Sequence, residues 1–86
     1  MSTTSKLTAK ALILASGPTS PSAGDVINNA LRDFVHEKGD LQRIDLGGRT
    51  IVALEIKLDP AHADAISEEL ETLGKRAALD IAMEIL

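Results

Sequence analysis

Residues 16–24 read Ser-Gly-Pro-Thr-Ser-Pro-Ser-Ala-Gly and join a short apolar run to an amphipathic segment. The apolar run, residues 7–15, first alternates and is then apolar on both faces, which is typical of a strand between two neighbours. The amphipathic segment predicts a helix over residues 23–38, because its apolar residues recur at the spacing of one helical face. These residues are Val26, Ile27, Ala30, Leu31, Phe34 and Val35. The loop therefore marks the first strand-to-helix connection of the fold.

The same loop is the first candidate binding site. Ser22 is placed to cap the helix, with Asp25 three residues further on. The first N–H groups of a helix lack partners within the helix, so they can hold a small anion such as a carboxylate. A turn followed by a helix cap would contain the same residues, and the sequence leaves both interpretations open. Gly39 is expected to end the helix as its C′ residue.

After this helix the chain predicts a hairpin, a second helix and a last strand. Residues 41–46 and 49–58 are the two hairpin strands, and the even positions of the second are the expected buried ones. Asp59 and Pro60 open the second helix as cap and first residue. The last strand has apolar residues at alternate positions, namely Ala77, Leu79, Ile81, Met83 and Ile85.

The hairpin turn at Gly47-Gly48 sets the register of the two strands. A two-residue turn would place Ile44 and Leu46 on the face opposite to the buried positions of the other strand. A three-residue loop that includes the next residue pairs Leu46 with Thr50 and Ile44 with Val52, which gives one apolar face. We therefore predict the three-residue loop.

The order strand, helix, strand, strand, helix, strand predicts an α+β fold, the ferredoxin-like βαββαβ sandwich. Its four-stranded antiparallel sheet has the order 4-1-3-2 with two helices on one face, because β-α-β crossovers are right-handed. Strands one and three are then central, in agreement with their apolar sequences. We expect residues 1–9 to be a flexible N-terminus with the start of the first strand, and residues 10–86 to be a single domain.

Composition excludes several classes of function. The net charge of −4 and the single aromatic residue, Phe34, argue against binding to nucleic acid. The lack of cysteine excludes disulfides, thiolate catalysis and cysteine-based metal sites. Residues 1–8 are polar and lack the apolar core of a signal peptide, and no run approaches the ~20 apolar residues of a membrane span. We expect a cytoplasmic protein that binds a small ligand or another protein.

The pattern of residues resembles an ACT domain, a family of regulatory modules that sense amino acids. The resemblance rests on Ser16-Gly17 at the end of an apolar strand, the loop 17–21, a helix, Gly39-Asp40-Leu41 before a hairpin, and a second helix. It covers residues 10–86. The chain is most similar to the ACT-like region that precedes the phosphatase domain in some bacterial phosphoserine phosphatases, enzymes of serine biosynthesis.

This resemblance implies an amino-acid ligand, with serine as the leading candidate, a homodimer, and an attached or associated enzyme domain. The implied ligand-binding residues are Gly17, Pro18, Thr19, Ser20, Pro21 and Ser22. Thr19 stands where the family usually has an acidic residue, and Ser22 stands where it usually has a second glycine. A threonine hydroxyl forms a hydrogen bond but cannot pair with an ammonium group as a carboxylate does. A structural dimerisation module without a ligand is therefore the alternative.

Catalysis by this chain is not expected. It lacks the D-x-D-x-T motif of the corresponding phosphatases, and His36, on the polar side of the first helix, and His62, in the first turn of the second, belong to no motif. The cluster Glu68, Glu69 and Glu71 is most simply a solvated helix face. We expect no metal and no cofactor in this chain, with Mg only in an attached phosphatase domain. A regular strand that stops at Leu86 favours a fragment of a longer protein over a free-standing module.

Overall fold

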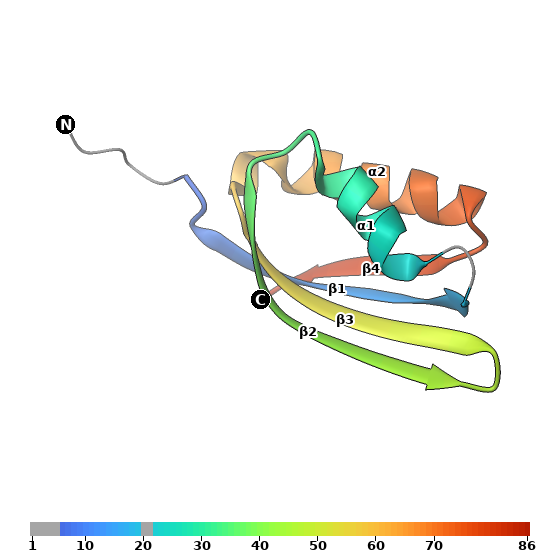
Figure 1. The fold of residues 1–86 in the computed structure, drawn as a ribbon. Helices are drawn as coiled ribbons and strands as arrows, with labels where there is room; N and C mark the ends of the chain where they lie inside the picture. Colours follow the sequence, from blue (N-terminus) through green and yellow to red (C-terminus); the bar gives the residue numbers. More distant parts are fainter. Residues whose placement is uncertain (1–5, 20–21) are drawn as a thin grey trace.

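The computed structural model describes residues 6–19 and 22–86 and contains the expected four strands and two helices. The elements are β1 (Ala9–Pro18), α1 (Ala23–Leu31), β2 (His36–Leu46), β3 (Arg49–Leu58), the 3-10 turn η1 (Pro60–His62), α2 (Ala63–Arg76) and β4 (Asp80–Ile85). The strands form one antiparallel sheet of order β2-β3-β1-β4, and both helices lie on the same face of it (Figure 1). This confirms the predicted ferredoxin-like fold and its strand order. Most of the expected flexible N-terminus, residues 1–5, lies outside the described residues.

The core lies between the sheet and the two helices and is aliphatic. The even positions of β3 are buried along its whole length, from Thr50 to Leu58, as predicted. The largest fully buried side chains come from both central strands and both helices: Ile13, Ile27, Leu31, Ile56, Leu58, Ile66 and Leu70. Within the two described stretches of the chain, no helix is long and apolar enough to cross a membrane.

The prediction for the end of the first helix is wrong. α1 ends at Leu31 instead of residue 38, and β2 begins at His36 instead of residue 41. Backbone pairing explains the difference, because His36 lies opposite Leu58 and the extended β2 matches the full length of β3. His36 is therefore a strand residue and not part of a polar helix face. The chain turns at Phe34, whose N–H donates to the carbonyl oxygen of Leu31 at 3.0 Å.

Gly39 consequently has a different role from the predicted helix stop. It lies inside β2, next to an irregularity in the register between Lys38 and Leu41. A Cβ atom at Gly39 would lie 3.0 Å from Oε1 and 3.3 Å from the backbone oxygen of Glu55. The glycine therefore permits a close approach of β2 to β3.

The predicted hairpin register is also wrong. Leu46 pairs with Arg49 and Ile44 with Ile51, so the turn has two residues, Gly47 and Gly48. Their φ angles are 56° and 79°, and two consecutive positive values define the tight turn that matches the twist of a hairpin. The geometry of the turn therefore sets the register, although this register leaves two apolar residues of β2 off the buried face. As a result, Ile44 and Leu46 lie on the face of the sheet that carries no helix.

The start of the second helical segment follows the sequence closely. The side chain of Asp59 accepts a hydrogen bond from the N–H of Ala61 at 2.9 Å, and Pro60 is the first residue of η1. After α2, Ala78 adopts a positive φ of 59° and the chain reverses into β4, which begins only at Asp80. The predicted alternation holds as far as Met83, since Leu79 is buried and Ile81 and Met83 pack against the core, whereas Ile85 is exposed.

Candidate functional site

The predicted ligand-binding loop is shorter than its sequence indicates, because β1 continues to Pro18. Gly17 and Pro18 are strand residues that pair with Thr50 and Arg49. Thr19 follows directly and is exposed, and its N–H donates to the carbonyl oxygen of Gly48 at 3.3 Å. The predicted residues Ser20 and Pro21 lie outside the described residues. The end of β1 and the hairpin turn are therefore joined beside the start of α1.

Gly17 has a structural role that accounts for its identity. A Cβ atom there would lie 2.4 Å from Cδ2 of Leu79 and 3.1 Å from the backbone oxygen of Ala78. Gly17 is buried where β1 passes the turn between α2 and β4. A side chain at this position would disturb the fold itself, so Gly17 is not a selective probe of ligand binding.

Ser22 occupies the N-cap position of α1, as predicted, with an extended backbone. Its carbonyl oxygen accepts the N–H of Val26 at 3.2 Å. Considering residues 6–19 and 22–86, the Ser22 hydroxyl makes no capping hydrogen bond. Among the predicted ligand residues, Thr19 and Ser22 are the described ones that flank the start of the helix.

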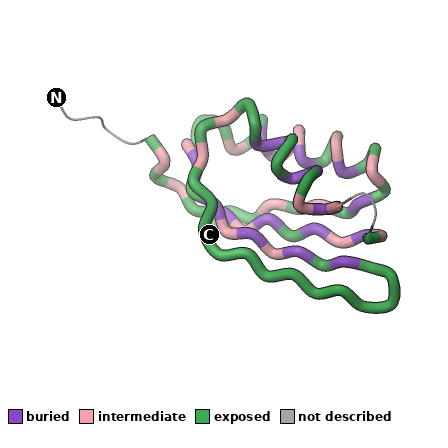
Figure 2. The backbone as a smooth tube through the Cα atoms, viewed as in Figure 1, coloured by how far each residue is buried: buried purple, intermediate pink, exposed green. Residues whose placement is uncertain are grey.

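A groove of about 170 Å³ lies beside α1, where the helices leave the inner side of β2 uncovered. β2 is exposed along nearly its entire length (Figure 2). Val52 and Leu54 of β3 line the groove, together with Ile27 of α1 and Leu41 of β2. This volume is smaller than the ~300–1,000 Å³ of pockets for drug-sized ligands, so the groove suits a molecule as small as an amino acid.

Two polar side chains stand at this groove, Asn28 on α1 and Lys38 on β2. The ammonium group of Lys38 donates a hydrogen bond to Oδ1 of Asn28. Gly24, in the first turn of α1, also lines the groove, and a Cβ atom there would meet nothing closer than Oγ of Ser22, at 3.6 Å. The groove thus combines an apolar floor with a cation, an amide and the start of a helix. This set can bind a carboxylate and an aliphatic or small polar side chain.

Sequence reasoning missed the groove because it placed the residues of both walls on one helix. With α1 extended to residue 38, Asn28 and Lys38 would be separated along a single helix; the strand begins at His36 and brings Lys38 opposite Asn28. The available signal was Gly39, which we assigned to a helix end. Had Gly39 been assigned to an irregular strand, Lys38 would have been placed on the edge strand of the sheet.

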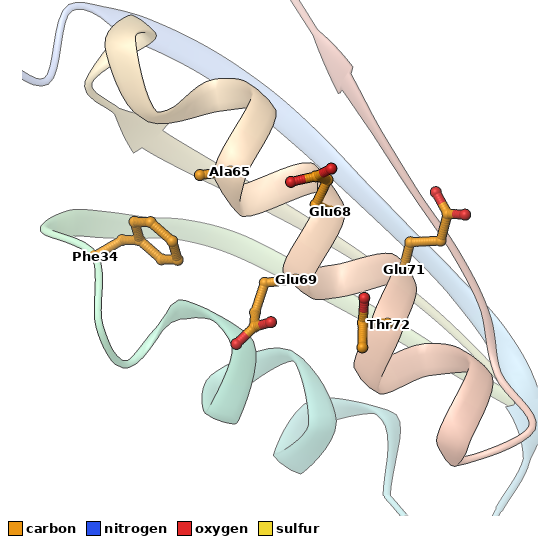
Figure 3. A pocket seen from close by; sticks show the side chains of 6 residues that line it. All are labelled: Phe34, Ala65, Glu68, Glu69, Glu71 and Thr72. Carbon is orange, nitrogen blue, oxygen red and sulfur yellow. The ribbon is translucent and has the colours of Figure 1, made fainter.

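A second, wider hollow lies between α2 and the turn that follows α1 (Figure 3). It has a volume of about 560 Å³ and is lined by Phe34, Ala65, Glu68, Glu69, Glu71 and Thr72. The glutamates point in different directions, with Glu69 toward α1 and Glu71 away from it (Figure 3). Glu71 pairs with Lys75 at 3.0 Å, and both side chains are exposed. This arrangement is that of a solvated helix face and carries no binding geometry.

The edge strand β2 carries one perturbed carboxylate, Asp45. The hydroxyl of Thr50 donates to Oδ1 of Asp45 at 2.7 Å, and Nε of Arg43 lies 3.3 Å from the same oxygen. The hydrogen bond from Thr50, and then Arg43, lower the pKa of Asp45 below its ordinary value. Asp45 is thereby kept as an anion beside a cation on the free edge of the sheet.

No family model matches this sequence, and neither does any of the curated proteins. Among solved structures, an ACT domain protein from Streptococcus pneumoniae superposes with a TM-score of 0.75 at 14% identity, over 90% of this chain and 89% of that one. A formyltetrahydrofolate deformylase from Burkholderia mallei gives 0.76 at 17% identity, over 88% of this chain and 28% of the other.

The regulatory subunit of aspartate kinase from Thermus thermophilus gives a TM-score of 0.68 at 19% identity, over 88% of this chain and 50% of that subunit. The chain therefore spans about a quarter of the deformylase and half of the kinase subunit. At these identities the likeness concerns the backbone. This chain shares the βαββαβ fold of an ACT domain protein and of a regulatory subunit.

Proposed function

We propose that this chain is a regulatory module of the ACT type that binds a free amino acid in the groove between α1 and β2. The observation that supports this is the groove itself, which has the volume of a small amino acid and places Lys38 and Asn28 above an apolar floor. Lys38 would pair with the ligand carboxylate, and the Asn28 side-chain oxygen would accept from its ammonium group. The module has no catalytic role of its own.

The identity of the ligand and of the attached enzyme rests on the loop sequence. Residues 16–21 resemble the first loop of the ACT-like region of phosphoserine phosphatases, so we propose serine as ligand and such a phosphatase as the regulated enzyme. A groove of about 170 Å³ accommodates a small side chain better than an aromatic one. The location proposed for such a metabolic module is the cytoplasm.

One observation favours the alternative, a dimerisation module without a ligand. Thr19 replaces the usual acidic residue, and its N–H is already bonded to Gly48. In addition, Lys38 and Asn28 satisfy each other across the groove. In this alternative their hydrogen bond would hold α1 and β2 together and would leave neither side chain available to a ligand.

We further propose that the module dimerises by antiparallel pairing of β2 with β2 of a second copy. In a hairpin with a two-residue turn, the closing pair Leu46 and Arg49 is hydrogen bonded, and bonded pairs alternate along the strands. The backbone N–H and C=O groups of Arg43 and Asp45 therefore point away from β3, to the free edge. An edge with unpaired backbone groups is a template for a further strand.

The side chains of β2 favour one register for this pairing. If Ile44 faces Ile44 of the second copy, Arg43 of each copy lies directly opposite Asp45 of the other. The side chains of Arg43 and Asp45 are half exposed, at 51% and 53%, so they are available for such contacts. This register forms two oppositely charged pairs across the dimer, whereas centring on Arg43 would place two cations together.

The ligand proposal is tested by calorimetric titration and thermal unfolding with each amino acid in turn. We expect serine to raise the midpoint of unfolding, and a ligand at about 100 times its Kd adds roughly 2.7 kcal/mol of stability. Lys38→Met should reduce the affinity by tenfold or more, because a charge-assisted hydrogen bond to a carboxylate contributes ~1.5–3 kcal/mol. Lys57→Met, on the opposite face of the sheet, is the matched control and should leave binding unchanged.

The outcomes separate the two candidate functions. Binding of one amino acid that Lys38→Met weakens and Lys57→Met preserves establishes the groove as the site. If no amino acid binds and Lys38→Met instead lowers the unfolding temperature, the hydrogen bond to Asn28 is a structural strut and the ligand proposal fails.

A further inference from the structure

The face of the sheet opposite the helices carries an apolar surface that the fold leaves uncovered. Four large side chains on it are exposed, Leu14 (42%), Ile44 (53%), Leu46 (67%) and Ile51 (45%). They lie on one face because residues paired across an antiparallel sheet point the same way, and Ile51 pairs with both Ile44 and Ser16. We call these four residues the outer patch. Figure 1 shows this face of the sheet without a helix.

The outer patch occupies one end of this face, and charges occupy the other. Leu14 pairs with Ala53 and Ala82, so small apolar residues adjoin the patch. Two residues earlier in β1, Leu12 lies between its pairing partners Glu55 and Glu84, and Lys10 pairs with Lys57. Arg49, which pairs with Leu46, and Asp80, which pairs with Ser16, also lie on this face near the hairpin turn. The face is therefore mostly apolar near the turn, with these two charges beside the patch, and charged at its other end.

Pairing of two copies through β2 would merge their outer patches, an argument that rests on the proposed dimer. The two-fold axis would pass through the Ile44 pair, so the patches of both copies would form one band across the middle of an eight-stranded sheet. The charged ends would be carried to opposite corners. Pairing through β4 would instead bring Asp80 and Glu84 of two copies together, which argues for β2 as the shared edge.

Area decides what can cover the band. Strands are about 4.8 Å apart and rise about 3.3 Å per residue, so five residues on each of four strands span about 300 Å². Two single sheets packed face to face would bury about 600 Å² in total, the size of a crystal contact. Two eight-stranded sheets would bury about 1,200 Å², which reaches the range of stable, specific interfaces.

We infer that two β2-paired dimers pack face to face through their merged outer patches, so that the chain forms a tetramer. The occupant of the outer patch is then the outer patch of a second dimer. Two-fold symmetry places the mostly apolar ends of the two dimers against each other, while Lys10 and Lys57 extend beyond the facing hairpin turn, where they stay in water. Asp80 lies at the margin of the band, on the outermost strand.

The test is sedimentation equilibrium of the full chain and of three variants over a wide range of protein concentration. We expect the wild-type chain to be a tetramer. Ile51→Glu should abolish the tetramer and leave dimers, and Leu46→Glu, at the most exposed position of the outer patch, should do the same. Lys57→Glu changes a charge on the same face outside the patch and should leave the tetramer intact.

A further variant separates this inference from the proposed dimer. Arg43→Asp places like charges opposite each other at the β2 edge and should give monomers, and exchanging the two residues in Arg43→Asp/Asp45→Arg should restore assembly. A wild-type chain that is only a dimer, with Ile51→Glu unchanged, would refute the face-to-face packing and leave the β2 pairing standing. A wild-type monomer would overturn both, although the ligand groove could still be tested by titration.

Discussion

Replacing Gly17 by alanine should destabilise the domain through a steric clash at one defined place. The new Cβ atom would lie 2.4 Å from Cδ2 of Leu79, 3.1 Å from the oxygen of Ala78 and 3.3 Å from Cα of Leu79. Leu79 belongs to the buried core, so its side chain can rotate only by disturbing other packing. The two backbone atoms must also move by a few tenths of an ångström.

The expected cost follows from these contacts. Overpacking of a filled core costs about 1–3 kcal/mol, and a domain of 86 residues has roughly 4–13 kcal/mol in total. We expect Gly17→Ala to lower the free energy of unfolding by about 2 kcal/mol. In a domain of this size each kcal/mol shifts the unfolding midpoint by about 4–8 °C, so the midpoint should fall by about 10 °C.

The assay is chemical and thermal unfolding followed by circular dichroism, with Gly24→Ala as the matched control. A Cβ atom at Gly24 meets only Oγ of Ser22, at 3.6 Å, so this variant should be as stable as the wild-type chain or up to ~1 kcal/mol more stable. Leu79→Val removes the closest contact, so Gly17→Ala should cost less in that background, with a coupling energy of about 0.5–3 kcal/mol. Equal stabilities of Gly17→Ala and Gly24→Ala, or strict additivity with Leu79→Val, would refute this account.

Two further predictions concern single hydrogen bonds. Thr50→Val removes the donor to Asp45, so the pKa of that carboxyl, measured by NMR titration, should rise toward its ordinary value; an unchanged pKa would mean that Arg43 alone sets it. The pKa of Asp45 is lower in the folded chain than its ordinary value, so the hydrogen bond stabilises the fold at pH values above that ordinary value. This contribution is lost as the pH falls through the pKa of the folded state. Thr50→Val should therefore lower the free energy of unfolding at neutral pH, and progressively less in acid. Asp59→Ala removes the acceptor for the N–H of Ala61 and should lower the free energy of unfolding by about 0.5–2 kcal/mol in denaturant titrations, while Asp59→Asn should retain most of it.

The element order, the strand order and the buried face of β3 could be predicted because each depends on periodicity over many residues. The even positions from Thr50 to Leu58 are buried as their alternation indicates. The cap at Asp59 was equally readable, since proline after an aspartate fixes the start of a helical turn. The errors lie at the hairpin register and at the end of α1, where a tight turn or a distant strand pairing overrides the apolar pattern of the segment.

The hairpin register shows why burial alone was misleading. The prediction assumed that Ile44 and Leu46 must face the core, but two consecutive glycines in a tight turn pair Leu46 with Arg49. Apolar residues can also lie on the outer face of a sheet when a second surface covers that face. The sequence of one chain does not show whether such a surface exists, so it could not correct the register. The predicted end of α1 was wrong for a related reason: His36 pairs with Leu58, a residue distant in the sequence, and the local pattern does not reveal this pairing.

The predicted loop residues and the groove share the start of α1, and the groove also includes a wall, β2, that the prediction did not contain; the ligand contacts themselves stay a prediction. Ser22 lies at the start of α1 as expected, and the groove extends from there along β2 to Lys38 and Leu41. Gly17 and Pro18, which the resemblance implied as ligand contacts, pair with Thr50 and Arg49 of β3. The groove depends on contacts between α1 and β2, and neither element has a sequence pattern that reveals the other.

The strand that no helix covers, β2, would couple the two proposed equilibria, binding of an amino acid and pairing of two copies. Its inner side chains Lys38 and Leu41 line the groove, while Arg43 and Asp45, a few residues along the same strand, stand at the proposed edge between copies. A molecule that holds β2 in place would lower the entropy cost of pairing it, and pairing would in turn tighten the binding of that molecule by the same factor. The concentration of the protein itself would then act as an effector, making the apparent affinity for an amino acid depend on how much of the chain is present.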